Sequence, residues 1–283
     1  MMINETLLRL VPPILRARDF RLYTQDGRRL VDLWQYGGAA ILGHTPAGFL
    51  RTLKNTAQRG LFAPLPNPQE KRFIKALSQL LPSRIFRLYT GEASLRRALV
   101  QGGYPIPDSV PFPDPALSTV TLPNSGPVLW RPFLDEGTFS KCPILIPVLP
   151  LPWPGAPQVL ALEPTIAPGF PPSDLISPLS LTVATRSLWD LITVIPERKK
   201  INFPHIKKTL NQSKWQGNSI YLHYGEAQEE QNILQRFKTF LAHDFLLPPT
   251  PQDPLILPGI LSPGEEIKLA KLLGDISDPG QLS

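Results

Sequence analysis

The 283-residue sequence has a single cysteine, Cys142, and this shortage limits the chemistry available to the chain. One cysteine excludes an intramolecular disulfide and any metal site built from several cysteines. Free cysteines are usually buried, where they behave as small hydrophobic residues. We therefore expect Cys142 to have a packing role.

Long apolar runs are also absent. No stretch approaches the roughly 18 apolar residues of a membrane-spanning helix, and the apolar residues 143–162 are interrupted by prolines. The first ten residues contain an acid and no continuous apolar segment, so we expect no signal peptide. The sequence thus predicts a soluble, cytoplasmic protein without a membrane partner. Its 42% of hydrophobic residues is enough for a sizeable core.

Proline is the residue in excess. The chain has 35 prolines, and 19 of them lie between Gln101 and Pro178. Because proline breaks helices and cannot donate a hydrogen bond to a sheet, this middle third should consist of loops, short strands and extended connections.

Hydrophobic spacing predicts the elements of the first hundred residues. Two apolar runs on either side of Asp26-Gly27 favour a hairpin over residues 23–33. Apolar residues at helical spacing predict helices over residues 47–59 and 68–81. A β-prone run at 85–89 then leads through Thr90-Gly91-Glu92 into a further helix that reaches Val100.

The turn at Thr90-Gly91-Glu92 is the first candidate binding site. A strand, a turn of small residues and a helix place free backbone N–H groups where they can hold a phosphate. As a bare pattern, however, T-G-E-A is more simply explained as an ordinary helix start with Thr as the N-cap and an acid in the first turn.

Two segments carry a family resemblance. Residues 21–46 read R-L-Y-T-Q-D-G-R-R-L-V-D-L-W-Q-Y-G-G-A-A-I-L-G-H-T-P, and residues 88–99 read L-Y-T-G-E-A-S-L-R-R-A-L. They resemble the entry segment of class III aminotransferases, which are pyridoxal-phosphate (PLP) enzymes of fold type I. Weaker likenesses follow in the same order at residues 158–164, 177–188 and 236–273, where Ser262 to Glu265 has capping-box spacing. In this family His44 belongs to a structural turn near the subunit interface.

The resemblance implies a site and also shows a defect in it. Thr90, Gly91 and Glu92 match the turn that holds the PLP phosphate, although hydroxyl and glycine have exchanged places. Glu163-Pro164 resembles the end of a strand near the cofactor. The following interval, where the family has its Schiff-base lysine and an aspartate for the ring nitrogen, contains Asp174 and no lysine before Pro178.

A transaminase needs that lysine to hold PLP and to move a proton. Lys141, which follows Asp135-Glu136, is the substitute candidate, and Tyr104 is a candidate for stacking on the ring.

The resemblance implies an α/β protein of PLP-dependent transferase fold type I, with a truncated proline-rich large domain and a small α+β domain. We expect an entry segment at residues 1–100, a remnant of the cofactor domain at 101–176 and a small α/β domain at 177–283.

Three functions fit these observations. The preferred one is a catalytically inactive class III-like protein, with no cofactor or residual PLP, that binds a second copy or another aminotransferase-like chain. The second is an active transaminase that uses Lys141. The third is a nucleic-acid-binding protein. The net charge of +6 includes a basic cluster interleaved with Phe203, His205 and Trp215, and this cluster consists of Arg198, Lys199, Lys200, Lys207, Lys208 and Lys214. A solvated surface explains this cluster more simply, and no nucleic-acid motif accompanies it.

Overall fold

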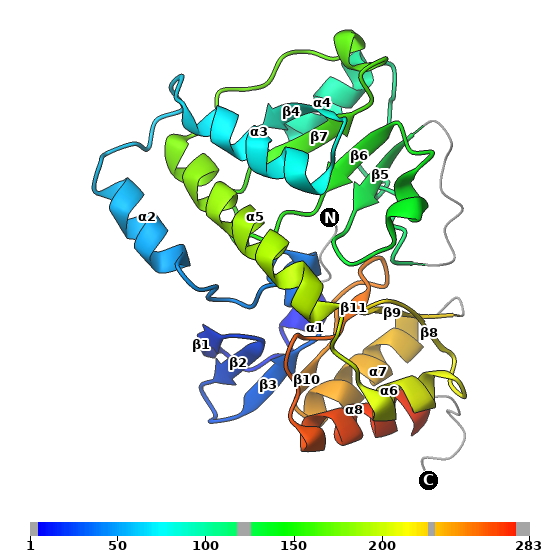
Figure 1. The fold of residues 1–283 in the computed structure, drawn as a ribbon. Coiled ribbons are helices and arrows are strands. Elements are labelled where there is room, and N and C mark those ends of the chain that lie inside the picture. Colours follow the sequence, from blue (N-terminus) through cyan, green and yellow to red (C-terminus); the bar gives the residue numbers. More distant parts are fainter. Residues whose placement is uncertain (1–4, 118–125, 226–229, 276–283) are drawn as a thin grey trace. The chain divides into compact units, whose positions relative to one another are not determined.

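The computed structural model describes residues 5–117, 126–225 and 230–275, which form two compact units (Figure 1). Unit 1 comprises the described residues of 1–44, 116–119 and 197–283, and unit 2 those of 45–115 and 120–196. These boundaries differ from the expected divisions at residues 100 and 176. The reason is a strand pairing that joins the N-terminal hairpin to the C-terminal part of the chain.

That pairing builds the first sheet of unit 1, in the order β1-β2-β3-β10. Its strands are β1 (Ile14–Arg18), β2 (Arg21–Thr24), β3 (Arg29–Asp32) and β10 (Phe245–Leu246). The β2–β3 hairpin confirms the prediction from Asp26-Gly27, and Gly27 has the positive φ of 80° that its turn requires. Strand β10 runs parallel to β3, with Phe245 beside Val31.

A second, three-stranded sheet and four helices complete unit 1. The strands are β8 (Trp215–Asn218), β9 (Tyr221–Tyr224) and β11 (Leu255–Ile256), and the helices are α1 (Glu5–Leu8), α6 (Pro204–Leu210), α7 (Glu230–Ala242) and α8 (Pro263–Asp275). One hydrophobic core connects both sheets with these helices, and it includes Leu30, Phe240, Phe245 and Leu269. The expected C-terminal α/β element is therefore present.

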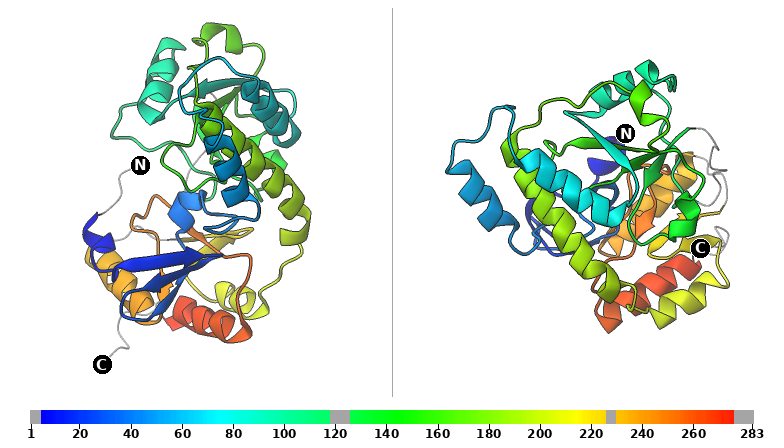
Figure 2. Two further views of the ribbon diagram at one scale, coloured as in Figure 1. Left: turned by 90° about the vertical axis from the view of Figure 1, so that its left-hand side faces the viewer. Right: turned by 45° about the horizontal axis from the view of Figure 1, so that its top comes forward.

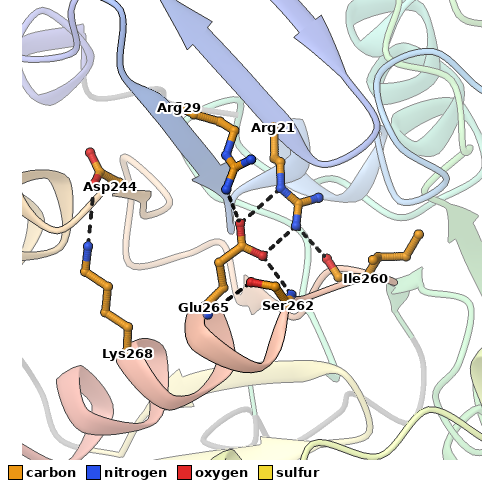
Figure 3. Close-up of polar contacts among 7 residues, drawn as sticks. All are labelled: Arg21, Arg29, Asp244, Ile260, Ser262, Glu265 and Lys268. Carbon is orange, nitrogen blue, oxygen red and sulfur yellow. Dashed lines mark hydrogen bonds and ion pairs between the residues drawn. The ribbon is translucent and has the colours of Figure 1, made fainter.

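Helix α8 begins with the predicted capping box (Figure 3). The Glu265 N–H donates to Ser262 Oγ at 3.3 Å, and the Ser262 N–H donates to Glu265 Oε2 at 2.8 Å. The same carboxylate accepts a hydrogen bond from Arg21 Nε at 3.1 Å and pairs with Arg29 at 3.4 Å. Glu265 therefore caps its own helix and also ties α8 to strands β2 and β3.

The segment after β3 is a tight turn in which η1 (Gln35–Gly38) is a short 3-10 helix. Asp32 Oδ1 accepts the N–H groups of Trp34 and Gln35, while its Oδ2 lies 2.8 Å from His44 Nε2. Gly43 has a φ of 89°, and a Cβ there would lie 3.0 Å from the Asp19 carbonyl oxygen. His44 thus closes a turn of unit 1, in keeping with the structural role expected for it.

Unit 2 contains a four-stranded sheet in the order β4-β7-β6-β5. Its strands are β4 (Ile85–Tyr89), β5 (Pro127–Trp130), β6 (Ile144–Pro147) and β7 (Gln158–Leu162). Strand β7 is antiparallel to both of its neighbours, and β6 is parallel to β5. Strands β4, β5 and β6 therefore all point the same way, and their C-terminal ends share one edge of the sheet.

Four helices belong to unit 2: α2 (Phe49–Ala57), α3 (Gln69–Leu80), α4 (Glu92–Gln101) and α5 (Pro178–Arg198), of which the last two residues of α5 count with unit 1. Figure 2 shows α4 on one face of the sheet and α3 with α5 on the other. Leu95 and Leu99 of α4 pack on Leu160 and Leu162 of β7, which alternate with residues of the opposite face. The predicted helices are confirmed.

The proline-rich middle third has the expected short strands and connections, with 3-10 turns η2 (Glu136–Phe139) and η3 (Ala167–Gly169). Cys142 is buried, as predicted, and burial raises the pKa of its thiol. Among the described residues, no helix is long and apolar enough to cross a bilayer, and no cluster of acids, histidines and cysteine could hold a metal ion.

Candidate functional site: the turn between β4 and α4

The turn at Thr90-Gly91 connects β4 to the N-terminus of α4, as the sequence predicted. Gly91 is the N-cap residue and has extended backbone, with a φ of −175°. No side chain of Thr90 or Gly91 caps the helix, so the prediction of Thr90 as an N-cap is wrong. Thr90 instead directs its hydroxyl toward a residue far along the chain.

That residue is Asp174, whose carboxylate lies on the turn. Its Oδ2 accepts the Thr90 N–H at 2.9 Å, the Thr90 hydroxyl at 3.0 Å and the Ser94 hydroxyl at 2.7 Å. One backbone donor and two hydroxyl donors thus converge on a single anionic oxygen at the start of a helix. Donors of this kind at a helix N-terminus can also bind a phosphate.

The polypeptide on either side of Asp174 is held along the outer edge of β4. The Asp174 N–H donates to the Leu88 carbonyl oxygen at 2.8 Å, and the Leu88 N–H donates to Ser173 Oγ at 3.0 Å. The Tyr89 hydroxyl donates to the Pro171 carbonyl oxygen at 3.3 Å. Residues 171–174 therefore cover an otherwise open strand edge and carry the carboxylate to its position.

An aromatic contact fixes the start of this segment against α4. Phe170 stacks on Tyr104, with ring centroids 5.8 Å apart, and both rings belong to the core beneath α4. A Cβ on Gly102 would lie only 2.6 Å from the Phe170 ring, so this close packing requires a glycine. Tyr104, the candidate for cofactor stacking, thus packs one face of its ring against Phe170.

Hydrogen bonds dominate the ionisation of Asp174. Partial burial alone would raise the pKa of its carboxyl, but the bonds from Ser94 and Thr90, with the nearby charge of Arg97, hold that pKa below its ordinary value. Burial, followed by the Asp174 charge, raises the pKa of Tyr89 to about 12, although Arg87 opposes the shift. At neutral pH the turn therefore holds a carboxylate beside a neutral phenol.

Glu92, the third predicted member of the turn, has its carboxylate on the helix side. Its Oε1 accepts a hydrogen bond from Arg96 Nε at 2.9 Å, one helical turn further on. Burial would raise the pKa of Glu92, yet the bond from Arg96 and its charge outweigh that effect and lower it. Thr90 and Asp174 are brought together at the turn, whereas the pair of Glu92 with Arg96 lies within α4.

Lys141 lies at the opposite edge of the same sheet. It precedes β6, whose first residue Ile144 pairs with Leu162, and Leu162 pairs in turn with Ile85 at the start of β4. The turn follows Tyr89, at the other end of β4. At about 3.3 Å per residue, the length of β4 separates the two positions. The structure does not bring Lys141 to Thr90-Gly91.

Glu163-Pro164 lies at that same far edge. The predicted buried strand that ends at Glu163-Pro164 is confirmed as β7, but β7 runs antiparallel to β4, so its last residue, Leu162, pairs with Ile85 at the start of β4. Strand direction is set by long-range pairing, which a short motif does not encode.

In unit 1, one member of the basic cluster and one of the aromatic residues interleaved with it lie in the interior. Arg198 is buried, where it donates to the carbonyl oxygens of Ile41 and Leu257, and Trp215 is part of the core. Burial lowers the pKa of Arg198 to about 10. The exposed remainder is Lys199, Lys200, Lys207, Lys208 and Lys214. Base stacking on Trp215 is therefore not available at this surface.

The residues at the turn do not fit a cofactor phosphate. A phosphate would need the donors that Asp174 Oδ2 accepts, and its charge would repel the carboxylate at that point. In the sequence, Asp174 is the sole acid between Pro164 and Pro178, the interval in which the resembling family has its aspartate for the ring nitrogen. No local pattern places it at the turn. Its actual position follows from the pairing of residues 173 and 174 with β4.

Comparisons with known sequences agree with a distant relationship. No protein-family model matches the chain. An uncharacterized protein of Treponema pallidum (strain Nichols) is 31% identical over 182 residues, or 64% of this chain and 53% of that protein. The glutamate-1-semialdehyde 2,1-aminomutase of Aquifex aeolicus is 30% identical over 70 residues, or 25% of this chain and 16% of that enzyme. The chain thus spans about half of the length of the Treponema relative.

Solved structures give a broader match. The Plasmodium yoelii ornithine aminotransferase covers 94% of this chain, and the chain covers 93% of it, with a TM-score of 0.69 at 12% identity. The acetylornithine aminotransferase from Elizabethkingia anophelis covers 98%, with 99% of that chain matched, a TM-score of 0.66 and 12% identity. Identity this low shows the fold alone: this chain has the PLP-dependent, fold-type-I architecture of class III aminotransferases.

Proposed function

We propose that this chain is a non-catalytic protein of the aminotransferase fold that acts as a binding subunit, pairing with a second copy of itself or with another aminotransferase-like chain. One observation carries the proposal. The segment that should supply the Schiff-base lysine contains none, and it delivers the Asp174 carboxylate to the phosphate turn instead.

The chemistry of transamination explains why this observation matters. When PLP is bound, it supplies an electron sink that stabilises a carbanion, and a lysine of the protein must reach it from the same site. The described lysines of unit 2 are Lys54, Lys71, Lys75 and Lys141, all of them exposed. The first three lie on α2 and α3, and Lys141 lies at the far edge of the sheet. None of these placements supports proton transfer beside Thr90.

The segment from α2 to α3 supports a binding role. Only Thr56 of α2 is buried, and Figure 1 and Figure 2 both show this helix apart from the sheet of unit 2. Large apolar side chains remain exposed there: Leu50 at 64%, Phe62 at 56% and Leu65 at 63%. Several exposed apolar residues within one segment are typical of a protein interface. We call Leu50, Phe62 and Leu65 the apolar surface.

Absorbance spectroscopy with added PLP tests the loss of catalysis. We expect a colourless protein on which PLP forms no aldimine band, and borohydride reduction that leaves no pyridoxyl group attached. A yellow protein with a pyridoxyl group fixed by borohydride on Lys141 would establish the transaminase alternative and refute the proposal. The same attachment at another lysine would also refute it.

Size-exclusion chromatography with light scattering tests the binding role. We expect the wild-type chain to be a dimer and the variant Leu50→Glu/Phe62→Glu to be a monomer, because two charges would be buried in the interface. Leu15→Glu is the matched control, since Leu15 is 72% exposed in β1 of unit 1. A wild-type monomer that also fails to associate with an intact aminotransferase would contradict the binding role.

A further inference from the structure

We infer that the Asp174 carboxylate is a built-in ligand of the β4–α4 turn, so that the chain supplies its own anion where related folds take a phosphate from a cofactor. The inference deepens the proposed function and rests on it, because it names the group that holds the turn in place of PLP. It implies that the strand–turn–helix unit of this chain is ordered without any external phosphate.

Asp174 is held in place by contacts of its backbone and of neighbouring residues, which do not involve its carboxylate. Its own N–H pairs with Leu88, Ser173 accepts from Leu88, and Pro171 accepts from Tyr89. Phe170 packs into the space left by Gly102. A loop that approached the turn only through one flexible acid would have no such contacts. The carboxylate is therefore pre-positioned, and little entropy is lost when it binds.

The hydrogen-bond donors of the turn converge on one oxygen of the Asp174 carboxylate. Three donors from Thr90 and Ser94 meet one oxygen at 2.7–3.0 Å, which is the range of good hydrogen bonds to a charged acceptor. The partial positive charge at the N-terminus of α4 favours an anion at this point. Arg97 adds a positive charge nearby, and Tyr89, whose ionisation also depends on Arg87, interacts with the Asp174 charge.

A free phosphate would have to compete with Asp174 for the donors of the turn. Because Asp174 belongs to the same chain and its backbone is fixed, its local concentration at the turn exceeds that of a free anion at millimolar concentration. A phosphate would have to displace it and then lie beside the displaced charge. Removal of the carboxylate should therefore expose an oxyanion site that the wild-type chain does not offer.

Inorganic phosphate is the probe for this test, with binding followed through the Thr90 and Ser94 amide resonances of the full chain. We expect no saturable shift for the wild type and a saturable shift for Asp174→Ala, with affinity at least tenfold higher. Glu70→Gln is the control, because Glu70 is an acid at the start of another unit 2 helix, α3. It should behave as the wild type does.

Two results would overturn the inference. One is saturable phosphate binding by the wild type with a shift of the Thr90 amide. The other is a folded Asp174→Ala chain that gains no phosphate affinity. If that variant does not fold, the wild-type chain decides the question by a pH titration. The Thr90 amide should then titrate together with the Asp174 carboxyl carbon, and an amide that does not follow it would refute the inference.

The outcomes also separate this inference from the proposed function. A PLP aldimine in the wild type with an undisturbed Thr90 amide would refute the proposed function and leave Asp174 in place. Phosphate binding at Thr90 without an aldimine would refute the built-in ligand and leave the non-catalytic role standing.

Discussion

Helices α8 and α4 both begin at a carboxylate, but the two acids come from very different distances along the chain. Glu265 lies inside α8 and exchanges hydrogen bonds with Ser262, three residues before it. Asp174 lies 84 residues after Thr90 and 80 after Ser94. The first interaction is a local helix cap, whereas the second joins Asp174 to the turn before α4 and to the Ser94 side chain, and it exists only when the chain has folded back along β4.

The difference has a physical consequence for what each acid stabilises. A local cap stabilises its helix as soon as the helix forms, and Glu265 then uses its remaining oxygen capacity to hold Arg21 and Arg29. The hydrogen bonds of Asp174 close a long loop, so they must offset the entropy of that closure. The hydrogen bonds of Asp174 therefore depend on the tertiary structure of unit 2, whereas the bonds between Ser262 and Glu265 depend only on the formation of one helix.

Replacement of Glu265 should have the largest effect. Glu265→Ala removes the capping box and the paired bond to Arg21, whose side chain is 15% exposed. We expect the free energy of unfolding to fall by about 2–3 kcal/mol, since hydrogen bonds between charged groups are stronger than neutral ones. Urea unfolding measures the loss. Lys268→Ala on the same helix is the control, because its exposed pair with Asp244 should contribute little.

Asp174→Ala should have a smaller effect, about 1–2 kcal/mol, because it removes the partly exposed carboxylate that accepts hydrogen bonds from Thr90 and Ser94. Amide hydrogen exchange should show the loss in α4 and along β4 and not in α8. Phosphate should restore part of the stability of this variant and none of that of Glu265→Ala. Equal restoration in both variants would mean that phosphate acts nonspecifically.

Acid should weaken the hydrogen bonds of both Asp174 and Glu265 without any mutation. The folded chain holds the carboxyl pKa of Asp174 below its ordinary value of 3.8 and that of Glu265 below 4.5. Each contribution is thus complete above the ordinary value and is lost as the pH falls through the lowered one. We expect wild-type unfolding free energy to decrease across that acidic range, and the Glu265→Ala/Asp174→Ala chain to show a shallower decrease.

Single hydroxyl groups should contribute less. Ser94→Ala removes one of three donors to Asp174, and Ser262→Ala removes the acceptor of the Glu265 N–H. We expect each to cost about 0.5–1 kcal/mol in urea unfolding. A double variant of Ser94→Ala with Asp174→Ala should be less destabilised than the sum of the two, because the residues share one interaction. Strict additivity would mean that Ser94 and Asp174 do not stabilise the chain through a shared interaction.

Gly91→Ala should have the smallest effect. The φ of Gly91 is one that any residue adopts, and a Cβ there would meet nothing within 4 Å. We expect a change below about 0.5 kcal/mol, measured in the same way. A large loss would indicate that another group approaches the turn closely at Gly91.

The same contrast between local and remote interactions explains what the sequence could predict. The β2–β3 hairpin, the helices and the capping box depend on residues within a few positions of each other, and they were predicted with small boundary errors. The fold class followed from motifs in their family order. The parallel pairing of β10 with β3, the direction of β7 and the position of Asp174 depend on long-range pairing, which no local pattern contains. The local connection of β4 to α4 through Thr90-Gly91 was therefore predicted, whereas the carboxylate that lies on this turn was not.

The pairing of β10 with β3 also affects the order in which the protein can fold during synthesis. The hairpin strands leave the ribosome early, but their sheet is complete only after residues 245–246 emerge, and the whole of unit 2 is translated in between. At typical rates the stretch from residue 45 to 196 takes roughly 10–30 s. During that time Leu30 and Val31 lack the strand and helices that bury them in the folded chain, so these apolar residues of the hairpin stay uncovered until the later segments are made.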